Sequence, residues 1–179
     1  MILAQRLLKR QKVDLYHLTA AIIITFAAVL RLSLILVRWP STNSDEGTMM
    51  IMATNIAYHG QWPLNFYHQA YMGPIEAYLG AILFHLTGGP SVRALRVGVI
   101  FLVTLFFISI YWLTSHVFSR KLALVTLVFL SVGSIPVLTR ETIATGGSSQ
   151  TLLFGTLAFL LAFWLAATRY RTPSSDSTR

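Results

Sequence analysis

Two adjacent carboxylates, Asp45 and Glu46, are the residues of this 179-residue chain whose types and spacing best suit catalysis. The chain has only six acidic residues, and these two are its one adjacent pair. They follow a long apolar run. A carboxylate at a membrane surface can act as a general base toward an attacking hydroxyl or amine. We therefore predict that both are catalytic. The stabilisation of acids at a helix N-terminus would explain them without catalysis.

Cationic and polar side chains further along the chain are candidates for holding a phosphate. Arginine binds phosphate oxygens through paired hydrogen bonds and stabilises the charge of a departing phosphate. The arginines also fit a role as interfacial anchors, and the aromatic residues fit an interface belt as well as a sugar-stacking surface. The predicted substrate-binding residues are Arg93, Arg96, His59, His68, Tyr71, Arg140 and Glu141.

Metal ligands are poorly represented. The histidines lie singly on separate elements, which is weak support for a metal site. We therefore predict no metal-ligating residue and no certain cofactor, and we keep a divalent metal as a possible one. The chain has no cysteine, which excludes disulfides and thiolate sites.

Apolar runs must position these residues. The chain is 55% hydrophobic and 11% charged, with a mean hydropathy of +0.64. Its apolar residues form four runs, each within the about 17–25 residues that a spanning helix needs. We therefore predict an all-α, multi-pass membrane helix bundle of four spans, at 15–37, 97–117, 122–138 and 151–167.

Basic residues outnumber acidic ones, giving a net charge of +8. They cluster at the ends of the apolar runs, which indicates orientation signals and not nucleic-acid binding. We expect a cytoplasmic basic flank at 1–14, a transmembrane module at 15–167 and a disordered tail at 168–179. The first run is expected to stay uncleaved as a signal anchor. Within it, Arg31 either reaches the interface along its aliphatic stem or grips an anionic lipid head.

Two short helices are predicted between the first two spans. Ser44 is the expected N-cap of a helix over 44–59, with Gly60 after its end. A second helix is expected over 75–87 after Pro74, with Glu76 in a structural role near its start. Thirteen residues reach about 20 Å, against a hydrocarbon core of about 30 Å. Both helices are therefore predicted to be juxtamembrane.

Counting basic residues tests the topology. With four spans, nine lysines and arginines lie on the cytoplasmic side and four lie outside. If 75–87 also spanned, the counts would be seven and six. The positive-inside rule favours four spans with both termini in the cytoplasm. All the candidate site residues then share the non-cytoplasmic side of the cell (inner) membrane.

Several segments in order resemble the GT-C-type polytopic glycosyltransferases, which include the protein O-mannosyltransferases and the lipid A aminoarabinose transferase. The resemblance extends over about residues 15–167 and rests on the ordered series, since no single motif is highly specific. The matching segments are Ser44-Asp45-Glu46-Gly47 after an Arg-Leu near the end of the first span, Tyr71-Met72-Gly73-Pro74-Ile75-Glu76-Ala77-Tyr78-Leu79, Leu86-Thr87-Gly88 and Ala94-Leu95-Arg96.

The resemblance implies an inverting transferase that uses a polyprenyl-phosphate sugar and an acceptor protein, lipid or glycan, with Asp45 as base. The chain departs from the family in two ways. Relatives are usually several hundred residues long with many more spans, so we expect this chain to be a membrane glycosyltransferase or the N-terminal module of one, with activity of the short chain alone left open. Relatives commonly carry another acid in the second outside loop, where this chain offers Glu141 but has the uncharged Gln150. The alternative is a non-catalytic small membrane protein that binds lipid or a partner subunit.

Overall fold

A computed structural model describes the backbone of residues 2–169 and the side chains of residues 15–168. Within that range every regular element is a helix. The predicted tail lies almost entirely outside the described residues, as do the side chains of the basic flank. The helices are α1 (Ile2–Leu36), α2 (Ser44–His59), α3 (Ile75–Thr87), α4 (Val92–Val117), α5 (Arg120–Val132), α6 (Ile135–Arg140) and α7 (Ser148–Arg169).

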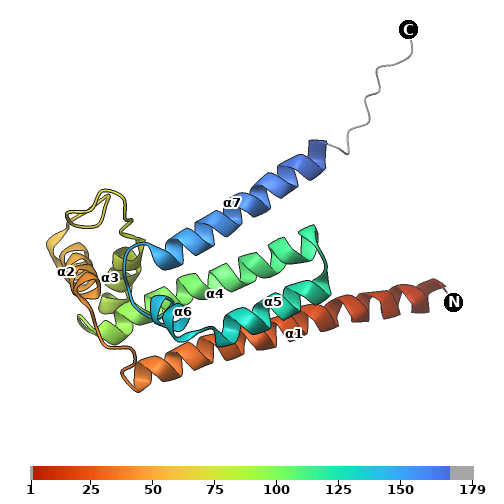
Figure 1. Cartoon of the computed structure of the whole chain (residues 1–179), viewed down its shortest axis with the longest axis horizontal. Coiled ribbons are helices and arrows are strands. Elements are labelled where there is room, and N and C mark those ends of the chain that lie inside the picture. The colour runs from red at the N-terminus through yellow and green to blue at the C-terminus, as the bar shows by residue number, and fades with distance from the viewer. Residues whose placement is uncertain (1, 170–179) are drawn as a thin grey trace, which may run out of the picture.

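The long helices lie lengthwise, and the short ones gather at one end (Figure 1). α1, α4 and α5 pack side by side, and α7 leaves the bundle at an angle from α4. α2 and α3 pack on each other and cover the first turns of α4. The end of α1 and the starts of α4 and α7 therefore face the same end of the molecule, where the candidate site residues also lie.

Three helices are long and apolar enough to cross a membrane: Leu15–Leu36 within α1, Val92–Val117, and Ser148–Thr168 within α7. They confirm the all-α prediction and indicate a membrane protein. The region predicted as a third span, 122–138, is not one continuous helix. α5 ends at Val132, and Gly133, with φ 51°, separates it from α6.

Sequence explains the break between α5 and α6. Gly133 adopts a positive φ at little cost, and Pro136 lacks the N–H that a continuous helix would need. The proline is instead accepted in the first turn of α6. α5 alone has 13 residues, which reach about 20 Å and fall short of the about 30 Å core.

The two short helices have the bounds expected from sequence. Gly60 and Gly88 end them with φ of 65° and 84°. The expected N-cap of α2 was wrong by one residue: Asn43 caps the helix, and its side chain accepts the Glu46 backbone N–H at 2.9 Å. Ser44 is the first helical residue, so the Asn43 oxygen reaches the N–H three residues on, in standard capping geometry.

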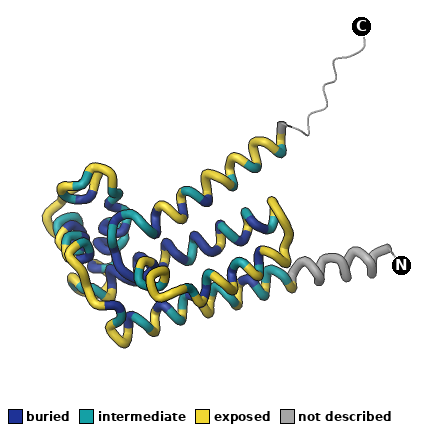
Figure 2. The backbone as a smooth tube through the Cα atoms, in the orientation of Figure 1, coloured by how far each residue is buried: buried dark blue, intermediate teal, exposed yellow. Residues whose placement is uncertain are grey.

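The core is centred on α4 (Figure 2). The span of α4 is 56% buried within the chain, against 22% for α1 and 11% for α7. Phe106 and Phe107 of α4 pack with Leu127 of α5 and Ala27 of α1 in the main cluster. Since only α4 is surrounded by its own chain, α1 and α7 present apolar faces outward.

Candidate functional site

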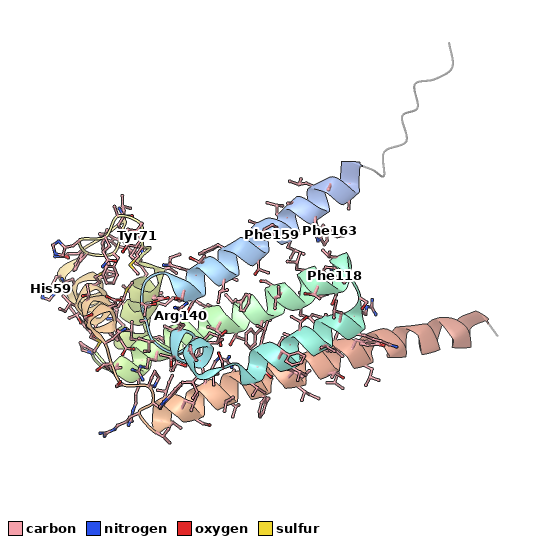
Figure 3. The ribbon with its side chains drawn as sticks, viewed as in Figure 1. His59, Tyr71, Phe118, Arg140, Phe159 and Phe163 are labelled. Atoms are coloured by element: carbon pink, nitrogen blue, oxygen red, sulfur yellow. The ribbon has the colours of Figure 1, made fainter. Side chains whose placement is uncertain are left out.

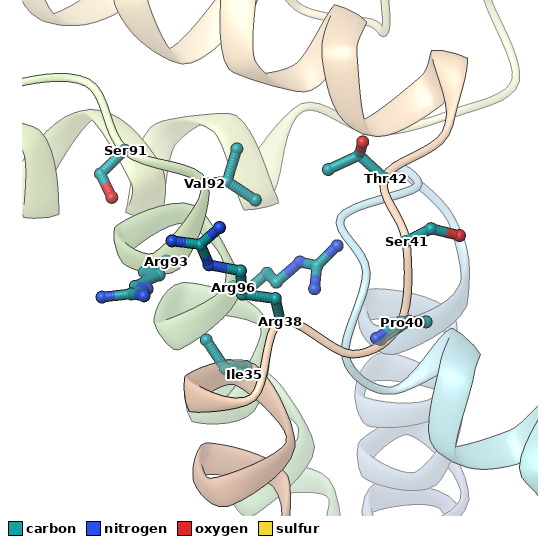
Figure 4. A pocket seen from close by; sticks show the side chains of 9 residues that line it. All are labelled: Ile35, Arg38, Pro40, Ser41, Thr42, Ser91, Val92, Arg93 and Arg96. Atoms are coloured by element: carbon teal, nitrogen blue, oxygen red, sulfur yellow. The ribbon is translucent and has the colours of Figure 1, made fainter.

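A cationic cavity of about 630 Å³ lies where α1 ends and α4 begins (Figure 4). Three arginines line it. Arg38 follows α1, Arg93 lies in the first turn of α4, and Arg96 lies in the next turn of α4. Arg38 and Arg93 are exposed, so their guanidinium groups are free to bind. The remaining lining residues are Ile35, Pro40, Ser41, Thr42, Ser91 and Val92. We call this the arginine pocket.

Sequence analysis identified Arg93 and Arg96 as substrate-binding residues but missed Arg38. Its backbone has φ 62°, which is uncommon for a residue other than glycine, and it directly precedes the chain turn into α2. No local pattern distinguishes Arg38 from an ordinary basic residue at the end of a span. Only the folded arrangement places it opposite Arg93.

Glu46 and Arg96 form a buried, two-pronged ion pair. Arg96 Nε donates to Glu46 Oε1 at 2.8 Å, and Nη2 donates to Oε2 at 2.7 Å. The side chains are only 1% and 3% exposed. Parallel hydrogen bonds of this kind are strong and directional. Both carboxylate oxygens of Glu46 are therefore occupied, and Arg96 is held with one face toward the arginine pocket.

Asp45 has different surroundings from its neighbour. It is half-buried in the first turn of α2, three residues after Thr42 of the arginine pocket. Within residues 15–168, whose side chains the structure describes, its side chain forms neither a hydrogen bond nor an ion pair. Of the two adjacent carboxylates, Asp45 is thus the one whose oxygens are available to a substrate.

A second cavity, of about 620 Å³, contains three other predicted binding residues: Tyr71, Arg140 and Glu141. It opens between α4, α6 and the first turn of α7. Tyr71 and Arg140 are exposed at its rim, whereas Glu141 is buried (Figure 3). Its walls are mainly apolar, including Met72, Phe106, Leu130 and Leu152. The predicted site is therefore divided between two cavities.

Arg31 explains why Glu141 is buried. Its guanidinium pairs with Glu141, with Nε at 3.2 Å from Oε2, and its face lies 5.0 Å from the Phe107 ring centroid. Arg31 is fully buried, so both predicted roles, reaching the interface and gripping a lipid head, were wrong. The pKa of Glu141 is raised, because the effect of burial exceeds the lowering by the positive charge and hydrogen bonds of Arg31. A partner 110 residues away in the sequence could not be predicted from a lone intramembrane arginine.

Glu76 is a buried carboxylate that sequence analysis treated only as structural. Its Oε2 accepts the Gly146 N–H at 2.9 Å, which ties α3 to the loop before α7. Its Oε1 is buried and has no hydrogen-bond partner among the described residues. The pKa of Glu76 is raised to about 7, mainly by burial and also by the charge of Glu46, against the lowering effect of backbone hydrogen bonds from Gly146 and Thr145. The structure gives this structural role a specific form. Glu76 connects the first turn of α3 to the loop before α7, and the pKa of its carboxyl group is near 7.

The two predicted histidines lie outside both cavities. His59 is exposed at the end of α2, where Figure 3 shows it at the outer edge, and His68 is exposed in the following loop with φ 63°. In the described part of the chain, no three His, Cys, Asp or Glu side chains come together as a metal site. The residues present do not fit a divalent metal, and no step proposed below uses one.

Comparison with known proteins gave no match to a protein-family model, a curated protein or a solved structure. The functional argument therefore rests on the site residues themselves. These are a pocket lined by three arginines, and Asp45, a carboxylate close to Thr42 of that pocket in the chain and without a hydrogen-bond partner among the described residues.

Proposed function

We propose that the chain is a membrane glycosyltransferase, or the N-terminal module of one, which transfers a sugar from a polyprenyl-phosphate donor to an acceptor protein, lipid or glycan. The observation that supports this most is the arginine pocket, which Arg38, Arg93 and Arg96 line together, with Asp45 three residues along the chain from its Thr42. Arginine side chains suit a phosphate monoester or diester, and a free carboxylate suits proton removal.

The topology that goes with this proposal has four crossings of the cell (inner) membrane. α5 and α6 together make the third crossing as a broken segment, and both termini are cytoplasmic. α2 and α3 are then juxtamembrane helices in the first outside loop. This arrangement places nine basic residues inside and four outside, in accord with the positive-inside rule. Both cavities open on the non-cytoplasmic side.

The proposed reaction is a single displacement at the anomeric carbon. The oxygen or nitrogen of the acceptor forms a bond to that carbon, and Asp45 accepts the proton that the acceptor hydroxyl or amine loses. The bond between the anomeric carbon and the phosphate oxygen breaks, and its electron pair leaves with the polyprenyl phosphate. Arg38 and Arg93 stabilise the negative charge that develops there. The attack comes from the face opposite the leaving group, so the configuration inverts.

Glu46 has a different role in this proposal from the one expected from sequence. Because both of its oxygens accept hydrogen bonds from Arg96, a proton transfer to Glu46 would break a buried ion pair. We assign Glu46 to positioning Arg96. Asp45 alone acts as base, with the acceptor near the start of α2.

The test is turnover of the full chain in nanodiscs containing undecaprenyl-phosphate mannose or undecaprenyl-phosphate aminoarabinose, measured as release of undecaprenyl phosphate. Asp45→Asn should abolish release while membrane insertion stays unchanged. General-base catalysis supplies about 10²–10⁴-fold, so a loss of that size is expected. Asp45→Asn with near wild-type release would exclude the catalytic role. Asp14→Asn, an acid outside the site, is the matched control.

A second candidate is a non-catalytic subunit that binds lipid or a partner protein. The low burial of α7, 11% over its span, favours it, because such a helix presents most of its apolar surface to other molecules. Binding of undecaprenyl phosphate without turnover of any donor would favour this candidate over the transferase.

A further inference from the structure

Two cavities are lined by residues of both α4 and α7, and neither shares a lining residue with the arginine pocket. The two helices diverge along their length (Figure 1). The outer cavity is the 620 Å³ one that contains Arg140, and the inner cavity, of about 430 Å³, begins about one turn further along α4. The inner cavity is lined by residues of α4 and α7 and by Phe118, which Figure 3 shows near Phe159 and Phe163. We call the two cavities together the α4–α7 crevice.

The mouth of the crevice carries one uncompensated positive charge. Arg140 is exposed and forms no ion pair within the described residues, and Ser148 beside it offers a hydroxyl. The neighbouring Glu141 does not neutralise Arg140, because its carboxylate is already paired with Arg31. A ligand at the mouth is therefore favoured if it is anionic.

Below the mouth the lining becomes apolar. Phe106, Leu130 and Leu152 line the outer cavity, and the inner one adds Ile110, Leu113, Phe159 and Phe163. A molecule that matches this gradient has an anionic head and a hydrocarbon chain. The burial of apolar surface and the charge at the mouth then act on the same ligand.

We propose that the α4–α7 crevice binds one anionic glycerophospholipid of the bilayer, with its phosphate on Arg140 and an acyl chain between α4 and α7. This goes beyond the proposed transferase, since it is a second lipid site away from the donor pocket. From Ser148 to Phe159 the helix rises about 16 Å. That is about half of the hydrocarbon core, the depth that one leaflet's acyl chain covers.

A partner helix fits the crevice less well. Membrane helices approach each other closely through small residues. Here the walls carry Phe106, Phe159 and Phe163, which hold a neighbouring backbone away. A partner would also have to bring an acid to Arg140, whereas an anionic lipid has its phosphate at the level of the interface.

The experiment measures how much phosphatidylglycerol stays bound to the full chain. The protein is taken from nanodiscs of phosphatidylcholine with phosphatidylglycerol, and retained lipid is counted by native mass spectrometry. Arg140→Gln should weaken phosphatidylglycerol binding about fivefold, the effect of one interfacial cation. Arg140→Lys should restore most of the binding. Arg120→Gln, at an exposed arginine that lines neither the crevice nor the arginine pocket, is the matched control and should leave this binding unchanged.

A cavity-filling variant tests the chain part of the site. Leu152→Trp, on the wall of the outer cavity, should lower retention at least as much as Arg140→Gln. Thermal unfolding checks that this variant is folded, and the Arg140→Gln and Arg140→Lys pair stays informative if it is not.

Several outcomes would overturn the proposal. Equal loss with Arg120→Gln would show general attraction to a basic surface. Equal retention of phosphatidylcholine would remove the role of the phosphate charge, and displacement by undecaprenyl phosphate would assign the crevice to the donor. Cross-linking between two copies through α7 would assign it to a second chain. None of these outcomes depends on transfer activity, so the two proposals can fail separately.

Discussion

Arg31 and Glu141 form a buried ion pair that joins α1 to the segment after α6. Arg31 also donates to the backbone carbonyls of Leu130 and Ser131, both at 3.2 Å, so the same side chain binds the last turn of α5. One guanidinium thus connects three parts of the chain at the point where the helix between Arg120 and Arg140 is broken. The carbonyls that the break leaves without intrahelical partners are satisfied by a charged donor.

Removal of Arg31 is expected to cost more than removal of the Glu141 charge. Arg31→Met leaves a buried carboxylate and open carbonyls, and breaking a buried pair in this way costs about 3–5 kcal/mol. Glu141→Gln leaves Arg31 with its three carbonyl partners, so its effect should be smaller. The measurement is the unfolding temperature in detergent, followed by tryptophan fluorescence.

The exposed neighbour Arg140 provides the control for that measurement. Arg140→Gln should change the free energy of unfolding by no more than about 0.5 kcal/mol. If Arg31→Met proved as mild as Arg140→Gln, the buried pair would not hold the broken helix. The double variant Arg31→Met/Glu141→Gln should be more stable than Arg31→Met alone, because it removes the unpaired buried charge.

Stability should depend on pH through Glu76. Its pKa is raised from 4.5 to about 7, mainly by burial, so the folded state prefers the protonated carboxyl. The favourable contribution is complete below pH 4.5 and is lost as pH rises through 7. A shift of this size corresponds to about 3 kcal/mol. Glu76→Gln, which stays neutral, should match the wild type at pH 4.5 and exceed its unfolding temperature at pH 8.5.

Asp45→Asn is the matched control for the pH experiment, because that carboxyl is half-buried and unpaired. It removes one negative charge without removing a side-chain hydrogen bond of the described residues, so it controls for the loss of charge. A Glu76→Gln variant that kept the wild-type fall in stability between pH 5 and 8.5 would mean that another group titrates.

Two adjacent glycines should respond differently to alanine. Gly146 has φ 79°, and an added Cβ would lie 2.6 Å from Met49 Cε and 3.0 Å from Phe66 Cδ2. Gly147 has no such crowding, since its nearest contact is Met72 Cε at 3.7 Å. Gly146→Ala should therefore destabilise the chain by about 1–3 kcal/mol through backbone strain and crowding. Gly147→Ala should be nearly neutral. Equal unfolding temperatures for the two variants would contradict the left-handed turn at Gly146.

Topology can be tested directly because the chain contains no cysteine. A cysteine placed at Ser91, next to the arginine pocket, should react with an impermeant maleimide from outside the cell. A cysteine at exposed Ser119, in the turn between α4 and α5, should react only after the membrane is opened. The reverse labelling pattern would contradict the proposed orientation, because both cavities would then open on the cytoplasmic side of the membrane.

Local patterns predicted the short helices well. Gly60 and Gly88 mark the ends of α2 and α3, because the residue that follows a helix often adopts the left-handed conformation, which glycine adopts most easily. The break at Gly133 and Pro136 was also visible in the sequence, yet the apolar run around it dominated the interpretation. Hydropathy measures the length of an apolar run and not whether one helix continues through it. The run at 122–138 therefore predicts one span, although two helices form there.

The partners of the charged residues could not be predicted in the same way. Glu46 meets Arg96 fifty residues later, and Arg31 meets Glu141. Such pairs are set by how helices pack, which no spacing within one segment encodes. Sequence analysis therefore identified Glu46, Arg96 and Glu141 as chemically important, but it could not tell that each is neutralised by a partner.

The two ends of the bundle are held together by different means. At the end with the cavities, Glu46–Arg96 and Arg31–Glu141 link helices through buried charges. At the opposite end, His17 meets the Tyr111 hydroxyl at 3.0 Å and stacks near Trp112, and α7 contributes only loosely packed aromatic rings around His116. Within the described residues, the buried ion pairs therefore lie at the end of the bundle where α1 ends and α4 and α7 begin, and contacts between aromatic rings join the helices at the other end.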